Sequence, residues 1–152
     1  MIELINIYRE WRKKMNYLPA AGVVILKEHE DGDHDVVCLI THTGMIDLTK
    51  GIIDPGENPL QTALREAQEE ASITNLDFKF GDTPLTHDAT TMYVAETDQE
   101  PEIQRNPHSG LFEHKSTEMI PLKDLVDDPR LLEYLRPAVE YAYELVYAKP
   151  PM

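Results

Sequence analysis

The sequence predicts an α/β sandwich, from its length, its strand-like segments and its helical periodicity. The 152 residues match one ordinary domain, and 41% hydrophobic with 28% charged residues is typical of a globular protein. The segments PAAGVVILK (19–27) and VVCLIT (36–41) are rich in β-branched residues and predict two strands. Elsewhere apolar residues recur at helical spacing. Strands with interspersed helices favour a layered α/β fold, so we expect residues 1–152 to form a single domain.

The chain is expected to begin with a short helix over residues 3–15. Its apolar residues share one helical face: Leu4, Ile7, Tyr8, Trp11 and Met15. The charged segment EHEDGDHD joins the two strands that follow, which predicts a hairpin. Its acids are spaced like the start of a calcium-binding loop: Asp31, Asp33 and Asp35. That loop would need glycine where Val36 stands and glutamate where His42 stands, so we interpret the segment as a solvated turn.

A helix is predicted from Asn58 to about Ala71, after a loop over residues 51–57. Asn58 can cap free backbone N–H groups, and Pro59 suits the first helical position. The expected buried stripe consists of Leu60, Ala63, Leu64 and Ala67.

Further strands are expected at 76–80, 89–96 and 114–122, with proline-bearing loops between them. A closing helix repeats its apolar residues at Leu131, Leu135, Val139, Ala142 and Val146. Pro137 either kinks this helix or starts a second one.

The charge of the chain limits its partners. Its 14 basic and 28 acidic residues give a net charge of −14, which argues against sequence-independent binding to nucleic acid or to an anionic membrane. An anionic substrate would need a metal ion or a local basic patch. The single cysteine excludes an internal disulfide and fits the cytoplasm. The first residues lack the apolar core of a signal peptide, and no apolar run is long enough to span a bilayer.

Three glutamates within the predicted helix form an acidic cluster. Glu66, Glu69 and Glu70 stand at i, i+3 and i+4 and project from one face. Like charges at this spacing repel, and a hard divalent cation, which prefers carboxylate oxygens, would reverse that cost. The alternative is a solvated acidic helix face without a ligand.

Residues 51–73 resemble the Nudix box, G-x5-E-x7-R-E-U-x-E-E-x-G-U, in which U is a bulky aliphatic residue. The pattern is filled here by Gly51, Glu57, Arg65, Glu66, Ala67, Glu69, Glu70, Ser72 and Ile73. The resemblance implies a Nudix-type α/β/α sandwich with a mixed sheet. It also implies Mg²⁺-dependent hydrolysis, with Mn²⁺ as the substitute, of a nucleoside diphosphate linked to another moiety, by water attack on phosphorus. The implied metal ligands are the three clustered glutamates and the backbone carbonyl of Lys50.

Two positions depart from the pattern. Ala67 is smaller than the usual aliphatic residue, which loosens packing without altering the acidic face. Ser72 replaces the glycine that ends the helix, and a left-handed conformation there costs about 1 kcal/mol. Alternatively, the helix ends differently and uses Asn75.

The remaining site residues follow from the same resemblance. In the family a further glutamate from a loop beyond the helix binds metal or acts as base. Glu113 is our choice and Glu118 the reserve, with a surface position as the alternative for each. His108 and His114 are expected at the surface, with a role as general base as the alternative. Arg65 is expected to pair with Glu57 or Glu69 and so orient the acids; the alternative is a direct phosphate contact.

The substrate is predicted less sharply than the reaction. IDLTKG (46–51) keeps Lys50 and Gly51 of a motif found in dinucleoside polyphosphate hydrolases, and both are candidate substrate contacts. Tyr93 and Phe112 are candidate stacking surfaces for a base, or core residues. We therefore expect a dinucleoside polyphosphate, with ADP-ribose, nucleoside triphosphates or a capped RNA end as alternatives. A non-catalytic nucleotide-sensing module is the third reading, which a missing box glutamate would have favoured; none is missing.

Overall fold

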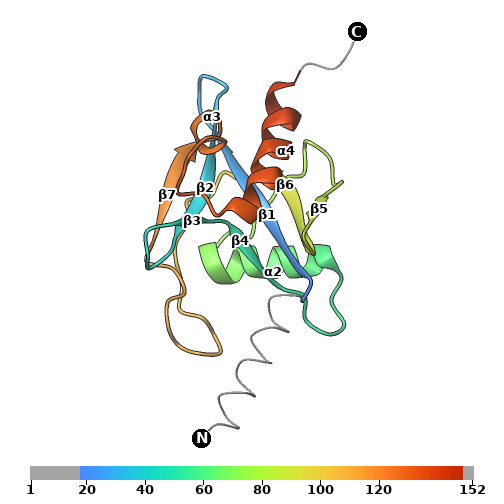
Figure 1. Ribbon diagram of the computed structural model, residues 1–152, viewed down its shortest axis with the longest axis vertical. Helices are drawn as coiled ribbons and strands as arrows, with labels where there is room; N and C mark the ends of the chain where they lie inside the picture. The colour runs from blue at the N-terminus through green and yellow to red at the C-terminus, as the bar shows by residue number, and fades with distance from the viewer. Residues whose placement is uncertain (1–17, 149–152) are drawn as a thin grey trace, which may run out of the picture.

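The computed structural model describes residues 18–148 (Figure 1). The helix expected at 3–15 lies outside the described residues. The strands are β1 Ala20–Glu28, β2 His34–Ile40, β3 Ile46–Asp47, β4 Thr49–Ile52, β5 Leu85–His87, β6 Thr90–Glu96 and β7 Ser116–Pro121. The helices are α2 Pro59–Ala71, α3 Leu122–Leu125, the short 3-10 helix η1 Glu133–Leu135, and α4 Arg136–Tyr147.

The strands form one mixed seven-stranded sheet with a central order β3-β2-β1-β6-β5. β1 and β6 run parallel, and the other pairings are antiparallel. Along one edge of β1, its first half pairs with β4 and its last residues pair with β2. The described part of β4 pairs only with β1, so this short strand lies at an open edge of the sheet.

Helices cover both faces of the sheet, as Figure 1 shows for α2 and α4. Odd-numbered residues of β1, such as Val23 and Ile25, pack in a core with the alanines of α2. Even-numbered residues, such as Val24 and Leu26, pack in a second core with α4. A strand buried on both faces is apolar along its length, which is why 19–27 reads as a continuous apolar run. The α/β/α sandwich with a mixed sheet is confirmed.

The start of α2 follows the predicted cap. Asn58 Oδ1 accepts a hydrogen bond from the Gln61 backbone N–H at 2.8 Å, and Gln61 Oε1 accepts one from the Asn58 N–H at 2.9 Å. This reciprocal pair satisfies free N–H groups at the helix start. The predicted stripe is wrong at Leu64, which is 39% exposed. The helix instead contacts the sheet through alanines, which allow a close approach: Ala63, Ala67 and Ala71.

Several predicted element boundaries are wrong. The expected strand at 76–80 reduces to an isolated bridge between Asp77 and Glu96. Gly51 and Ile52 lie in β4 instead of a loop, and β3 and β5 were also missed. Such short strands exist because a longer neighbour pairs with them, and their own sequences carry little strand signal.

The C-terminal region begins its helix later than predicted. Leu131 is buried but bridges to Ile46 of β3 instead of starting a helix. Pro137 lies in the first turn of α4, so it starts a helix and does not kink one. In the described residues, no helix combines the length and the apolar character needed to cross a membrane.

Candidate active site

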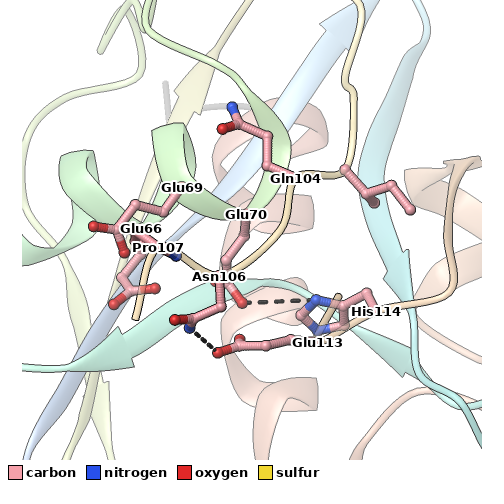
Figure 2. A pocket seen from close by; sticks show the side chains of 9 residues that line it. Glu66, Glu69, Glu70, Gln104, Asn106, Pro107, Glu113 and His114 are labelled. Carbon is pink, nitrogen blue, oxygen red and sulfur yellow. Dashed lines mark hydrogen bonds and ion pairs between the residues drawn. The ribbon is translucent and has the colours of Figure 1, made fainter. Parts of the chain in front are cut away.

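The predicted acids meet at a narrow cavity between α2 and the loop 97–115. Figure 2 shows Glu66, Glu69 and Glu70 projecting from the helix toward Asn106, Glu113 and His114 of the loop. The cavity measures about 20 Å³, room for one water-sized sphere. A wider cleft of about 420 Å³ continues from it along β4 and also reaches His108. The structure thus brings together all four glutamates predicted as ligands.

The box glycine makes room for the first of these acids. A Cβ atom added to Gly51 would lie 2.1 Å from Oε1 of Glu66, which is closer than any side chain tolerates. The carboxylate of Glu66 therefore lies directly against the backbone of β4. Burial raises the pKa of Glu66 to about 7, although the charge of Arg65 acts in the opposite direction.

Glu70 is the most enclosed of the four acids. Its Oε1 accepts a hydrogen bond from the backbone N–H of Lys50 at 2.8 Å. Burial raises its pKa to about 9, and this hydrogen bond offsets only part of the effect. Without a cation, Glu70 is therefore protonated at neutral pH.

A buried polar network behind Glu70 was not predicted. His114 Nε2 lies 3.0 Å from Asp47 Oδ2, and His114 Nδ1 lies 3.8 Å from Glu70 Oε2. Lys50 Nζ lies 3.0 Å from Asp47 Oδ1. Burial alone would raise the pKa of Asp47, but the hydrogen bond from His114 and the charge of Lys50 outweigh it and lower the pKa. Asp47 is therefore a carboxylate, which can only accept, so Nε2 of His114 carries the proton.

The prediction of a surface position for His114 is wrong, because its exposed fraction is 6%. The sequence contains one signal for Asp47, the residue that pairs with His114. Asp47 is an acid between two apolar residues, Ile46 and Leu48, in the segment before the box. A charge in such a position is buried only when it is paired, and its partner lies 67 residues further along the chain.

Arg65 joins the acids of the box. Its Nε donates to Glu57 Oε2 at 2.9 Å, and its second terminal nitrogen donates to Glu57 Oε1 at 3.0 Å. The other terminal nitrogen donates to Glu66 at 2.9 Å and to Glu69 at 3.2 Å. Both alternatives for the expected ion pair are present. Hydrogen bonds from Arg65 lower the pKa of Glu57 to about 2, which keeps this support charged.

Ser72 joins the end of α2 to the loop that carries Glu113. Its φ of 60° is the left-handed conformation, one of the two endings left open by the sequence, so the alternative ending at Asn75 is wrong. Ser72 N–H donates to Gln68 O and Ile73 N–H to Ala67 O, which closes the helix end. Ser72 Oγ donates to Glu102 O at 2.7 Å and accepts from Gln104 Nε2 at 2.6 Å. A glycine could not make these two contacts.

Glu113 and its reserve lie in different places. Glu113 is exposed at the rim of the acidic cavity, where Asn106 Nδ2 donates a hydrogen bond to it. Glu118 lies on β7 and pairs with Arg130 at 3.4 Å, and it does not line the cavity. Of the two candidates, the structure brings only Glu113 to the site.

The predicted stacking residues divide between core and loop. Tyr93 is 8% exposed and packs in the core beneath α2, edge-to-face with Phe78. Its assignment as a stacking surface is wrong because its ring is covered. Phe112 is 39% exposed, and the guanidinium of Arg105 lies 4.7 Å from its ring centroid. Lys50 and Gly51 line the wide cleft.

A family model described as NUDIX domain matches residues 16–142. The chain belongs to the Nudix family. Its reaction class is that of the Nudix pyrophosphohydrolases, which hydrolyse pyrophosphate bonds in nucleotide-linked substrates and use divalent metal ions. A comparison with curated protein sequences gave no match.

Solved structures share the fold of this Nudix protein at low sequence identity. The Nudix hydrolase RenU from M. smegmatis is 17% identical with a TM-score of 0.69, over 90% of this chain and 89% of that one. The NUDIX domain of Shewanella oneidensis NrtR, complexed with ADP ribose, is 20% identical with a TM-score of 0.61, over 84% and 86%. The binary complex of a C. elegans Ap4A hydrolase is 21% identical with a TM-score of 0.57, over 84% and 92%.

The donor set at the cavity fits a hard divalent cation. Ligand atoms of Glu70, Glu113 and His114 lie within 4.8 Å of one another, and carboxylates of Glu66 and Glu69 line the same cavity. A second acidic group, Glu28, His34 and Glu96, does not fit as well. Lys79 already supplies a cation there, with Nζ 2.9 Å from Glu96 and 3.4 Å from Glu28.

Proposed function

We propose that this Nudix protein is a Mg²⁺-dependent hydrolase of a nucleoside diphosphate linked to another moiety, with a dinucleoside polyphosphate as the preferred substrate. The observation that carries the proposal is the cavity of about 20 Å³ walled by Glu66, Glu69, Glu70 and Glu113. A cation there would bridge to substrate phosphates in the adjoining cleft, and Mn²⁺ would substitute for Mg²⁺. The similarity to an Ap4A hydrolase supports the choice of substrate.

The four glutamates would hold the cation, together with the backbone carbonyl of Lys50. The metal would screen the phosphate charge and lower the pKa of a bound water. Arg65 and Glu57 keep Glu66 and Glu69 oriented through the hydrogen bonds described above. This is the role we assign to Arg65, in preference to a phosphate contact, because its donors are already used.

Glu113 would take the proton from the attacking water. It is the exposed acid of the four, and Asn106 orients it at the cavity rim. His114 would act as a positioning residue. Asp47 holds the Nε2 side of the ring, which leaves Nδ1 facing Glu70 at 3.8 Å from its Oε2. A histidine held in this way keeps a defined face toward the site.

ADP-ribose is the second candidate substrate. The NrtR domain, which shares the fold, is complexed with ADP ribose. Nucleoside triphosphates and a capped RNA end complete the set, although the net charge of −14 disfavours long RNA. A non-catalytic sensing module is disfavoured because Glu66, Glu69 and Glu70 of the box all line the cavity.

The test separates and identifies the hydrolysis products of these four substrate classes by chromatography, with Mg²⁺, with Mn²⁺ and with a chelator. We expect two nucleotide products from the dinucleoside polyphosphate with either metal and none with the chelator. Hydrolysis in ¹⁸O-labelled water should place the label on a phosphate of one product, as attack on phosphorus requires. Full turnover in the chelator would refute the metal assignment, and binding without turnover of any substrate would favour the sensing module.

A further inference from the structure

A largely apolar hollow of about 460 Å³ lies where the described part of the chain begins. Leu18 forms part of its wall, together with Ala20, Ile52 and Tyr134. Leu18 is 41% exposed and Tyr134 is 40% exposed, so two large apolar side chains reach solvent in one hollow. The other large apolar side chains that are exposed among residues 18–148 do not line it. Exposed apolar surface gathered in this way indicates a contact surface.

The segment that precedes the hollow in the chain is amphipathic. Residues 3–15 come before the described residues, and their sequence predicts a helix with one apolar stripe: Leu4, Ile7, Tyr8, Trp11 and Met15. The family model begins at residue 16, so this segment is not part of the matched domain. A helix of this length is only marginally stable in water by itself, and packing of its apolar face is what stabilises it.

A very short connection joins this segment to the hollow. Only Asn16 and Tyr17 stand between Met15 and Leu18. Three peptide steps span at most about 11 Å, so the end of the segment lies within that distance of the wall formed by Leu18. The hollow is therefore the exposed apolar surface that the connection brings within reach.

The segment and the rest of the chain carry opposite charges. Residues 1–17 contain four basic and two acidic residues, a net charge of +2, and the rest contains ten basic and 26 acidic residues, a net charge of −16. At about 100° per residue, Arg12 and Lys14 flank the apolar stripe on its two sides. Asp88 lines the hollow, and Asp54 lines the adjoining acidic cleft. Basic side chains beside the stripe thus meet an acidic surround when the stripe is buried.

We propose that residues 3–15 dock as an amphipathic helix on this hollow, next to their own point of attachment. The apolar stripe covers the exposed side chains of Leu18 and Tyr134. Residues 50–52 of β4 line both the hollow and the acidic cleft, so the docked segment also borders that cleft. The proposal does not depend on the proposed function, because docking requires neither a metal ion nor turnover.

The test uses Trp11, the single tryptophan of the chain, as a reporter in the full-length protein. Excited where tyrosine does not absorb, wild-type Trp11 should be quenched by acrylamide severalfold less than in the urea-unfolded chain. Tyr134→Ala removes part of the docking surface and should raise the quenching constant toward the unfolded value. Tyr143→Ala is the matched control and should leave quenching unchanged, since Tyr143 is a 37% exposed tyrosine that does not line the hollow.

A pair of variants within the segment guards against misfolding of Tyr134→Ala. Ile7→Glu places a charge in the apolar stripe and should expose Trp11 to the quencher. Ile5→Glu makes the same change about 100° around the helix from Leu4, outside the stripe, and should leave Trp11 protected. Both substitutions precede the matched domain, so we expect both proteins to fold.

Docking within one chain predicts that the protection of Trp11 is independent of protein concentration and needs no lipid. Protection that is lost on dilution, together with a dimer, would assign the segment to a second copy. Protection that appears only with vesicles of anionic lipid would assign it to a membrane surface. Either result would overturn the proposal. So would wild-type Trp11 that is quenched as in the unfolded chain, or protection that persists in both Tyr134→Ala and Ile7→Glu.

Discussion

The hydroxyl of Ser72 donates a hydrogen bond to the backbone carbonyl of Glu102 at 2.7 Å, and so fastens the loop that bears Glu113 to the end of α2. The box has glycine at this position, which adopts the left-handed conformation more easily. The serine adopts it at a cost and gains the hydrogen bond to the loop. The backbone N–H of Glu102 also donates to Ala71 O at 2.9 Å. The loop therefore leaves the helix end in a fixed direction.

Ser72→Gly removes the side-chain hydrogen bonds to the loop and keeps the left-handed helix end. Glycine relieves a left-handed cost of about 1 kcal/mol but loses two hydrogen bonds of similar worth, so stability should change by less than about 1 kcal/mol. Turnover and Mg²⁺ affinity should fall severalfold because Glu113 is less well positioned. Ser72→Ala loses the hydrogen bonds and keeps the strain, so its melting temperature should be lower than that of Ser72→Gly. Unchanged metal affinity in both variants would show that the tether has no role.

Local signals predicted the parts of the fold and site that depend on neighbouring residues. The cap at Asn58 and the box acids lie within one segment, so α2 and its glutamates followed from spacing. The composition of β1, β2 and β6 also predicts these long strands. The seven-residue β2 and two-residue β3 show the limit. β3 carries Asp47, yet it is a strand only because β2 pairs with it.

Contacts between segments that are distant in the chain could not be predicted from the sequence. Nothing near His114 indicates that Asp47 pairs with it, and Tyr134 belongs to no motif. The amphipathic pattern also misplaced Leu64, because α2 approaches the sheet through alanines and rotates a larger side chain outward. Such features follow from tertiary packing, which cannot be predicted from the local pattern of a single sequence.

Asp47→Asn should lower turnover by disturbing His114 and Lys50, the two residues that Asp47 contacts. The amide loses the charge that holds Lys50 and can present a donor to His114 Nε2, so the imidazole no longer keeps a defined face toward Glu70. Turnover should fall about 10- to 100-fold, as for other residues that orient metal ligands. The melting temperature should also drop, because the partly buried Lys50 loses its partner.

The control for this variant is Glu118→Gln. Glu118 forms a solvent-exposed pair with Arg130 at 3.4 Å, and exposed pairs contribute little to stability. Both its turnover and its melting temperature should match the wild type. Wild-type turnover in Asp47→Asn would contradict the positioning role of the Asp47–His114 pair.

The metal-free protein should become less stable as the pH rises. Burial raises the pKa of Glu70 from 4.5 to about 9. Between these values the folded protein keeps a proton that the unfolded chain releases, so the free energy of unfolding declines with rising pH. The contribution of Glu70 is complete below its unfolded pKa and is lost as the pH rises through its folded pKa.

Urea unfolding in a chelator, at several pH values from about 5 to about 8, measures this effect. Relative to Glu70→Gln, the wild type should lose up to about 1.4 kcal/mol of stability per pH unit. Added Mg²⁺ should reduce the slope, since a cation stabilises the carboxylates. Parallel stability curves for the two proteins in chelator would contradict a buried, protonated Glu70.

The most direct test of a catalytic metal site is the turnover of Glu70→Gln at saturating Mg²⁺. Glutamine keeps the shape and the acceptor for the Lys50 N–H, and removes only the charge. Turnover should fall about 10²- to 10⁴-fold, with a melting temperature in chelator equal to or above that of the wild type. Glu28→Gln, in the hairpin, should have no measurable effect. Wild-type turnover in Glu70→Gln with a lowered melting temperature would mean that these acids are structural, and would contradict the metal-dependent mechanism.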